Sequence, residues 1–193
     1  MIKFNRSPAA LIMYSIISLG VIVSITSLFL FFFDFYYNSV VKWIGIVAFM
    51  ITYHLWLRLI MGNITKLFNI SYKHFFFKEA LFERYVYKLL TVKKWKNKVL
   101  TYNPESFDLK KNSLEDIANT MSKSEVDHWV NELISLSSLL FSLLWGEFYI
   151  FLITALFAMA FDMQFIIIQR FNRPRVVKII EKKNAMIKQA VGV

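Results

Sequence analysis

The amino-acid sequence predicts an all-α polytopic membrane protein with about four transmembrane helices and an amphipathic interfacial segment. Hydrophobic residues make up 57% of the 193 residues and aromatic residues 18%, which is more apolar surface than a soluble domain of this size needs. The apolar residues gather in long runs, and the charges that give a net charge of +10 lie between these runs. We therefore expect a single integral-membrane domain over residues 1–193.

The first predicted transmembrane helix covers about residues 9–33. This run has 25 residues without a charge, which is enough to cross the hydrocarbon core of a bilayer. It is too long for the apolar part of a signal peptide, and no small-residue cleavage site follows it. We expect it to be a retained helix.

The second predicted transmembrane helix covers about residues 40–61 and contains His54 and Arg58. Arg58 can extend its charged end to the near interface, so the segment remains a candidate span. A histidine at membrane depth either faces the interior of a helix bundle, where it has a function, or bonds a neighbouring hydroxyl group. The sequence leaves both readings of His54 open.

Residues 62–128 are predicted to form a cytoplasmic interfacial connection. Residues 63–98 hold nine Lys or Arg against two Glu, with many aromatic residues between them. This composition is typical of an amphipathic helix that lies among lipid head groups. Further along, Ser113 and Asp116 predict a helix start, with Ser113 as the cap and Asp116 in the third position.

The third and fourth predicted transmembrane helices cover about residues 129–145 and 148–168, with a short turn at Gly146-Glu147 between them. The fourth contains Asp162 and is followed by a tail, residues 169–193, with seven Lys or Arg and one acid.

Charge also predicts the orientation. The N-terminus, the long connection and the tail are basic, whereas the two short connections are not. By the positive-inside rule, this pattern predicts a multi-pass protein of the cell membrane with both termini and the active site on the cytoplasmic side.

Glu125 and His128 are the strongest candidates for chemistry. They are three residues apart, so they share one face of a helix, and Glu132 lies one turn further along the same face. A neutral histidine can act as a general base toward a hydroxyl group, and a nearby carboxylate can orient it. The structural alternative is that Ser124 caps a helix and Glu125 lies in its first turn, where a negative charge suits the helix dipole.

A metal or thiol site is not expected. Di-iron helix bundles use two Glu-x-x-His motifs with two further Glu, and this chain has one such motif, with His54 and His74 as its other histidines. It has no cysteine, which excludes a thiolate nucleophile, a disulfide and a Cys-ligated metal.

Two basic clusters could bind phosphate groups of a lipid or of coenzyme A, or could simply anchor the chain to anionic lipid. One is Lys93-Lys94-Trp95-Lys96-Asn97-Lys98 and the other is Gln169-Arg170-Phe171-Asn172-Arg173-Pro174-Arg175. In the second, Pro174 is expected to end the helix and to restrict Arg173 to an extended conformation. The arginines would then lie on a stiff turn, suited to bidentate contacts with phosphate or carboxylate.

Three stretches in this order resemble the glycosyl-4,4'-diaponeurosporenoate acyltransferases of staphyloxanthin-type carotenoid synthesis: residues 93–100, 125–129 and 167–175. Phe82-Glu83 and Lys88 are a looser match, and the resemblance covers roughly residues 77–175. It implies a cytoplasmic-membrane enzyme that transfers a fatty acyl group to a sugar hydroxyl of a lipid-linked glycoside. In the type reaction the acceptor is the C6 hydroxyl of glucose on a carotenoid.

These residues predict a direct transfer. His128 removes the proton from the acceptor hydroxyl, Glu125 orients His128, and the hydroxyl oxygen attacks an acyl thioester. The predicted substrate-binding residues, which would hold the donor phosphates or the developing oxyanion, are Lys94, Trp95, Lys96, Arg170, Asn172, Arg173 and Arg175. An acyl-enzyme is disfavoured because no cysteine exists and no serine sits in a nucleophile elbow.

The predicted partners are the lipid bilayer, a glycosylated lipid acceptor and an acyl donor, with no nucleic acid and no metal. No cofactor is expected beyond acyl-CoA or another acyl donor as co-substrate. Two alternatives remain open from the residues. One is a non-catalytic membrane scaffold or subunit, and the other is a transacylase that takes its acyl group from a phospholipid.

Overall fold

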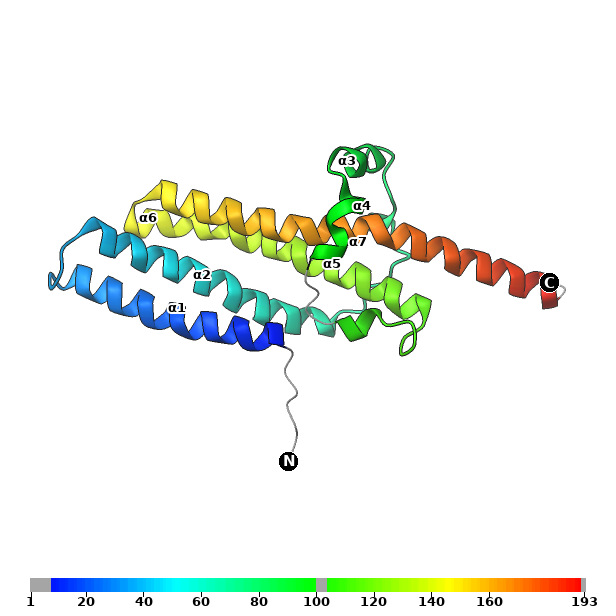
Figure 1. Ribbon diagram of the computed structural model, residues 1–193, viewed down its shortest axis with the longest axis horizontal. Coiled ribbons are helices and arrows are strands. Elements are labelled where there is room, and N and C mark those ends of the chain that lie inside the picture. The colour runs from blue at the N-terminus through cyan, green and yellow to red at the C-terminus, as the bar shows by residue number, and fades with distance from the viewer. Residues whose placement is uncertain (1–7, 100–103, 192–193) are drawn as a thin grey trace, which may run out of the picture. The chain divides into compact units, whose positions relative to one another are not determined.

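The computed structural model describes residues 8–99 and 104–191, and within this part of the chain every regular element is a helix (Figure 1). The all-α prediction is confirmed. The chain divides into two compact units. Unit 1 comprises Met1–Thr65 and Trp129–Asp162, and unit 2 comprises Lys66–His128 and Met163–Val193. The single domain over residues 1–193 stays a prediction.

Unit 1 contains the long apolar helices. They are α1 (Pro8–Phe32), α2 (Ser39–Ile64) and the first part of α7 (Phe148–Val191), joined by the last part of α5 (Leu114–Ser137), by η5 (Ser138–Phe141) and by α6 (Ser142–Trp145). In the described residues, three segments are long and apolar enough to cross a membrane: Leu11–Phe32, Ser39–Leu67 and Phe148–Ala190. These findings support membrane association.

The predicted third span, residues 129–145, is helical but changes to a 3-10 turn at Ser138–Phe141, and it is not among the three candidate spans of the described chain. The number of four transmembrane helices therefore stays a prediction. The basic residues 1–6, which contributed to the predicted orientation, lie outside the described residues.

One end of unit 1 is fixed by an ion pair and a small apolar core. Lys42, near the start of α2, binds Glu147 at 3.2 Å, just before α7 begins. Further along the same two helices, Ile46, Met50 and Phe151 pack together and are fully buried. The first residues of α2 and α7 therefore lie at the same end of unit 1.

Gly45 of α2 allows this helix to pack closely against α1. A Cβ atom added at Gly45 would lie 2.8 Å from two side-chain carbons of Leu28 and 3.2 Å from its backbone nitrogen. We expect Gly45→Ala to lower the free energy of unfolding by about 1–3 kcal/mol, because the helices must move apart. Thermal unfolding in detergent would measure the change.

Gly62 provides the matched control, since it lies in the same helix and a Cβ there meets nothing within 4 Å. Gly62→Ala should raise stability by about 0.5–1 kcal/mol through helix propensity alone. Equal effects of the two substitutions would contradict the close approach at Gly45.

Unit 2 begins with a series of short helices. They are η2 (Phe75–Phe77), α3 (Glu83–Leu89), α4 (Val92–Trp95), η3 (Lys96–Lys98) and η4 (Pro104–Phe107). Residues 63–98 therefore form a series of short helices and not the one amphipathic helix that their composition suggested. Thr91 explains one of the breaks, because its left-handed conformation, with φ of 48°, ends α3 and starts α4.

The predicted helix start at Ser113 is confirmed. The Ser113 hydroxyl accepts a hydrogen bond from the Asp116 backbone N–H at 3.1 Å, and Asp116 accepts one from the Ser113 N–H at 3.3 Å. This reciprocal pair is a capping box. Because α5 begins here, Ser124 lies well inside the helix, and the alternative that Ser124 caps a new helix is wrong.

The prediction that Pro174 ends the last helix is also wrong. Helix α7 continues from Phe148 to Val191 with Pro174 inside it, and Arg173 is helical. A proline in a helix loses one backbone hydrogen bond and crowds the preceding turn. Here the preceding turn carries Arg170 and Arg173. Their side chains bind carboxylates and backbone carbonyls of unit 2, and these contacts offset the free-energy cost of the proline.

Candidate active site

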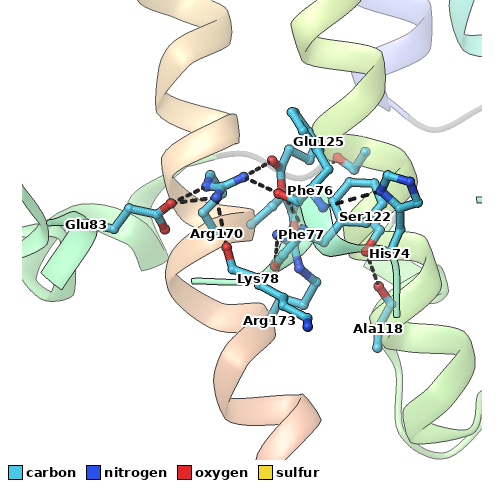
Figure 2. Close-up of polar contacts among 12 residues, drawn as sticks. His74, Phe76, Phe77, Lys78, Glu83, Ala118, Ser122, Glu125, Arg170 and Arg173 are labelled. Atoms are coloured by element: carbon cyan, nitrogen blue, oxygen red, sulfur yellow. Dashed lines mark hydrogen bonds and ion pairs between the residues drawn. The ribbon is translucent and has the colours of Figure 1, made fainter. Parts of the chain in front are cut away.

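Arg170 is the centre of a buried polar network in unit 2 (Figure 2). Its Nε and Nη2 atoms donate to Glu83 at 3.0 and 2.5 Å, and its Nη1 donates to Glu125 at 2.5 Å. The Nη1 and Nη2 atoms also donate to the backbone carbonyls of Phe76 and Lys78 at 3.3 and 3.2 Å. These five bonds equal the five N–H groups that a guanidinium carries.

Glu125 lies between two arginines. One carboxylate oxygen accepts from Arg170, and the other accepts from Nη1 of Arg173 at 2.5 Å. Glu125 is fully buried and Arg173 is 1% exposed. Arg173 also donates to the Phe77 carbonyl at 2.9 Å, and its guanidinium lies 4.8 Å from the Phe77 ring. Burial of these charges is tolerated because each is paired.

Glu83 closes the network on the side of α3. The Tyr87 hydroxyl donates to it at 2.6 Å, in addition to the bonds from Arg170. Burial alone would raise the pKa of Glu83, but the hydrogen bonds from Arg170 and Tyr87 outweigh it, so the pKa lies below its ordinary value. Its contribution to stability is therefore present above the pKa of the unfolded chain and lost as pH falls through the folded pKa.

The network is therefore internally neutral, since two carboxylates face two arginines. It ties η2, α3, α5 and α7 together within unit 2. Burial of Tyr87 and its bond to Glu83 raise the pKa of the Tyr87 hydroxyl, which keeps that hydroxyl a donor. Such a network positions backbone and side chains, and it leaves Arg170 no N–H group for a ligand.

His128, the predicted general base, lies one turn after Glu125 on α5. Its ring stacks on Phe165 of α7, with the two centroids 4.6 Å apart and the planes 4° from parallel. The residue is partly exposed. The stack fixes the plane of the imidazole and leaves its edge, where both nitrogens lie, outside the stacking contact.

A second group of cations surrounds Phe171. Lys96 lies 5.1 Å from the Phe171 ring and donates to the Asn172 side-chain oxygen at 2.8 Å. The Arg175 guanidinium lies 3.7 Å from the same ring and donates to the Phe171 carbonyl at 2.6 Å. Burial and then the charges of Arg175 and Lys93 lower the pKa of Lys96. We call Lys93, Lys96 and Arg175 the cationic patch.

The cationic patch differs from the network in its charge balance. Arg170 and Arg173 are neutralised by Glu83 and Glu125, whereas none of the three patch residues forms an ion pair within the described part of the chain. Uncompensated positive charge beside an aromatic ring is a suitable environment for phosphate.

Comparison with protein families now adds to this geometry. The family model of the glycosyl-4,4'-diaponeurosporenoate acyltransferases matches residues 73–182, which is 110 of the chain's 193 residues. The chain belongs to this family. No curated protein and no solved structure matches it. As a member of the glycosyl-4,4'-diaponeurosporenoate acyltransferases, the protein is an acyltransferase, and the resemblance inferred from its motifs is confirmed.

The matched region of this acyltransferase contains the network, His128 and the cationic patch. The structure places Glu125, Arg170 and Arg173 together, and it brings Lys96 to Asn172 and Arg175. The two remaining predicted binding residues lie on the turn that carries Lys96: the Trp95 indole donates to the Leu90 carbonyl at 2.8 Å, and Lys94 is exposed. The roles of all these residues in catalysis stay predictions.

Sequence reasoning missed two parts of the network of this acyltransferase. Glu83 was noted only as a looser match, and the backbone carbonyls of residues 76–78 received no role. The spacing of Glu83 and Tyr87 was a usable signal for the first, because residues i and i+4 meet on a helix. Nothing in the sequence marks a carbonyl that binds a distant arginine.

Proposed function

We propose that this acyltransferase moves a fatty acyl group from a thioester donor to a sugar hydroxyl of a lipid-linked glycoside, at the cytoplasmic face of the cell membrane. The observation that carries the proposal is the family match over residues 73–182, which contains the only stacked histidine of the described chain, His128, together with the cationic patch. The apolar helices of unit 1 suit an acceptor that is itself a lipid.

His128 acts as the general base in this proposal. Its imidazole takes the proton of the acceptor hydroxyl while the hydroxyl oxygen bonds to the thioester carbonyl carbon. The C–S bond then breaks, and the leaving thiolate receives the proton from the imidazolium. The products are an ester and a free thiol, so no other reactant is required.

Glu125 acts as a positioning residue. It lies three residues before His128 on α5, and Arg170 and Arg173 of α7 hold both of its oxygens. Phe165, which stacks on His128, also belongs to α7. The Glu125–arginine pairs therefore support the same α5–α7 alignment that the His128 stack requires.

The cationic patch holds the phosphates of the donor. Lys96 is partly exposed and Arg175 is exposed, and no carboxylate of residues 8–99 or 104–191 forms an ion pair with either. Asn172 orients Lys96 through the 2.8 Å hydrogen bond, and Trp95 fixes the preceding turn. Lys94 adds a further exposed charge on α4. Coenzyme A and a phospholipid both present phosphate, so the donor class is decided by experiment.

The test uses the purified full chain in lipid nanodiscs with a monoglucosyl lipid as acceptor. One arm supplies acyl-CoA with an isotope-labelled chain, and the other supplies a phospholipid with the same labelled chain. Mass spectrometry should find labelled acyl ester on the sugar in the first arm. Label from the second arm alone would identify a phospholipid transacylase. No labelled ester in either arm, with acceptor and donor intact, would favour the scaffold alternative.

The cationic patch gives a kinetic prediction. We expect Lys96→Ala and Arg175→Ala each to raise KM for the phosphate-bearing donor about tenfold, since a hydrogen bond to a charged group contributes about 1.5–3 kcal/mol. The rate at saturating donor should change little, because the patch contacts no reacting atom. Initial rates in the nanodisc assay measure both.

Lys188→Ala is the matched control, because Lys188 is an exposed cation in the last turn of α7. It removes the same charge and should leave KM unchanged. An equal rise in KM for Lys188→Ala would show that the donor responds to positive charge in general and not to the cationic patch.

A further inference from the structure

Helix α3 buries a hydrogen-bonded polar pair and exposes apolar side chains. Glu83 and Tyr87 are buried, and the Tyr87 hydroxyl donates to Glu83 at 2.6 Å. Phe82, Tyr85 and Leu89 are 69%, 70% and 69% exposed. A helix that covers a protein core in water shows the reverse arrangement, with its apolar stripe buried and its polar residues outside. The arrangement of α3 therefore suits apolar surroundings.

The exposed apolar residues lie on one side of α3. Phe82, Tyr85 and Leu89 are three and four residues apart, and this spacing places side chains on the same face of a helix. Phe82 caps α3 and has the backbone angles of a helix, so the spacing applies to it as well. At 3.6 residues per turn, Glu83 and Tyr87 share the opposite face. We call Phe82, Tyr85 and Leu89 the apolar face of α3.

Such a surface calls for an occupant. A single exposed apolar residue on a protein is ordinary, whereas several that adjoin indicate an interaction surface. Leu81, which directly precedes the apolar face, is 90% exposed as well. With these four residues the surface is too small for a stable protein interface, which takes about 20–30 residues on each side. A lipid bilayer sets no such requirement, because a few apolar and aromatic side chains can enter it.

The position of Arg170 along α7 gives the level at which α3 is held. Helix α7 starts at Phe148 and is a candidate membrane span. Arg170 is twenty-two residues further on, which is about 33 Å at 1.5 Å per residue, and a hydrocarbon core is about 30 Å thick. A span that starts at Phe148 therefore reaches the lipid head groups near Arg170. Because Arg170 binds Glu83 at 2.5 Å, α3 lies at this level too (Figure 2).

Cations of α3 adjoin its apolar face and complement an anionic lipid surface. Arg84 and Lys88 are both exposed. Arg84 pairs with Glu79, whereas Lys88 forms no ion pair within residues 8–99 and 104–191. Lysine beside an apolar surface keeps its charge among the lipid head groups, and anionic head groups attract it.

We propose that the apolar face of α3 inserts into the boundary between the head groups and the acyl chains of the lipid bilayer. The opposite face of the same helix stays bonded to Arg170 through Glu83, so the inserted helix is fixed to α7. This contact attaches unit 2 itself to the membrane, in addition to the apolar helices of unit 1. The inference goes beyond the proposed function and does not depend on acyl transfer.

The absence of cysteine from the sequence makes a direct test possible. Tyr85→Cys and Leu89→Cys, each made singly in the full chain, carry one nitroxide spin label in nanodiscs of phosphatidylcholine and phosphatidylglycerol. Electron paramagnetic resonance then compares collisions of the label with oxygen, which concentrates in hydrocarbon, and with a water-soluble nickel complex. Oxygen should reach both labels more than nickel does, at a depth of about 5–10 Å below the head groups.

Leu109→Cys is the matched control. Leu109 is 67% exposed, close to the value for Leu89, and it also belongs to unit 2, but its chain neighbours are Asp108 and Lys110. Its label should be reached more by nickel than by oxygen. If Tyr85→Cys does not fold, Leu89→Cys decides the outcome, because Leu89 is the last residue of α3.

Two results would overturn the inference. In the first, nickel reaches the labels on α3 as readily as it reaches the label at position 109, so the apolar face lies in water. In the second, oxygen and nickel are both excluded from the α3 labels, so a protein surface such as a second copy of the chain covers the face. Neither result bears on acyl transfer, which the assay with labelled donors measures separately.

Discussion

Glu125→Gln is expected to lower the free energy of unfolding by about 3–5 kcal/mol, the usual effect of removing one partner from a buried ion pair. The substitution keeps the shape of the side chain, but it leaves Arg173, which is 1% exposed, without its counter-charge. Arg170 keeps Glu83 as a partner, so the loss should fall mainly on Arg173. Denaturant unfolding in detergent, followed by tryptophan fluorescence, would measure it.

Glu79→Gln is the control for this experiment. Glu79 pairs with Arg84 at 3.0 Å, but the Arg84 side chain is 63% exposed, and such a pair contributes less than about 1 kcal/mol. The double variant Glu125→Gln with Arg173→Met should be more stable than Glu125→Gln alone, because the orphaned charge is gone. If the free energy of unfolding of Glu125→Gln lies within about 1 kcal/mol of the wild-type value, the buried pair contributes little to stability.

His128→Gln should lower the rate of acyl transfer by about 10²–10⁴-fold, the contribution of a general base. Glutamine fills much of the volume beside Phe165 and retains a hydrogen-bonding amide, but it takes no proton at neutral pH. KM for the donor should stay near the wild-type value, since the cationic patch is intact. The nanodisc assay with labelled donor would measure the rate.

His74→Asn is the matched histidine control. His74 caps η2 by accepting a hydrogen bond from the Phe76 N–H at 3.3 Å, and asparagine can serve the same capping role. This variant should remain active. If His128→Gln folds and transfers acyl groups at the wild-type rate, His128 is not the base, and another group must take the proton.

Local patterns in the sequence predicted the long helices well. The charge-free run ending at Phe33 and the apolar run up to Met61 gave α1 and α2 within a few residues, because hydropathy and length together define such helices. The Ser113–Asp116 capping box was also predicted, since its partners are three residues apart and depend on no distant contact.

Long-range contacts account for the errors. Pro174 was expected to end a helix because proline is costly there, but the side chains of Arg170 and Arg173 bind distant groups and keep α7 continuous. Glu125 resembled a first-turn acid, and its charge is instead matched by α7. The pairing of Glu125 with residues 45 and 48 positions away carries no local signature, so the sequence identified Glu125, Arg170 and Arg173 as candidates but not the contacts between them.

The position of Arg170 in the chain has a consequence for biosynthesis. The short helices of residues 75–89 are synthesised long before the arginine that binds their carbonyls and Glu83. During translation, the carboxylates of Glu83 and Glu125 and the carbonyls of this segment therefore lack their arginine partners until α7 has been made. Unit 2 therefore completes its network only when the last helix of the described chain has been made. A chain that ends before Arg170 would contain the apolar helices of unit 1 but would lack both arginines of the network.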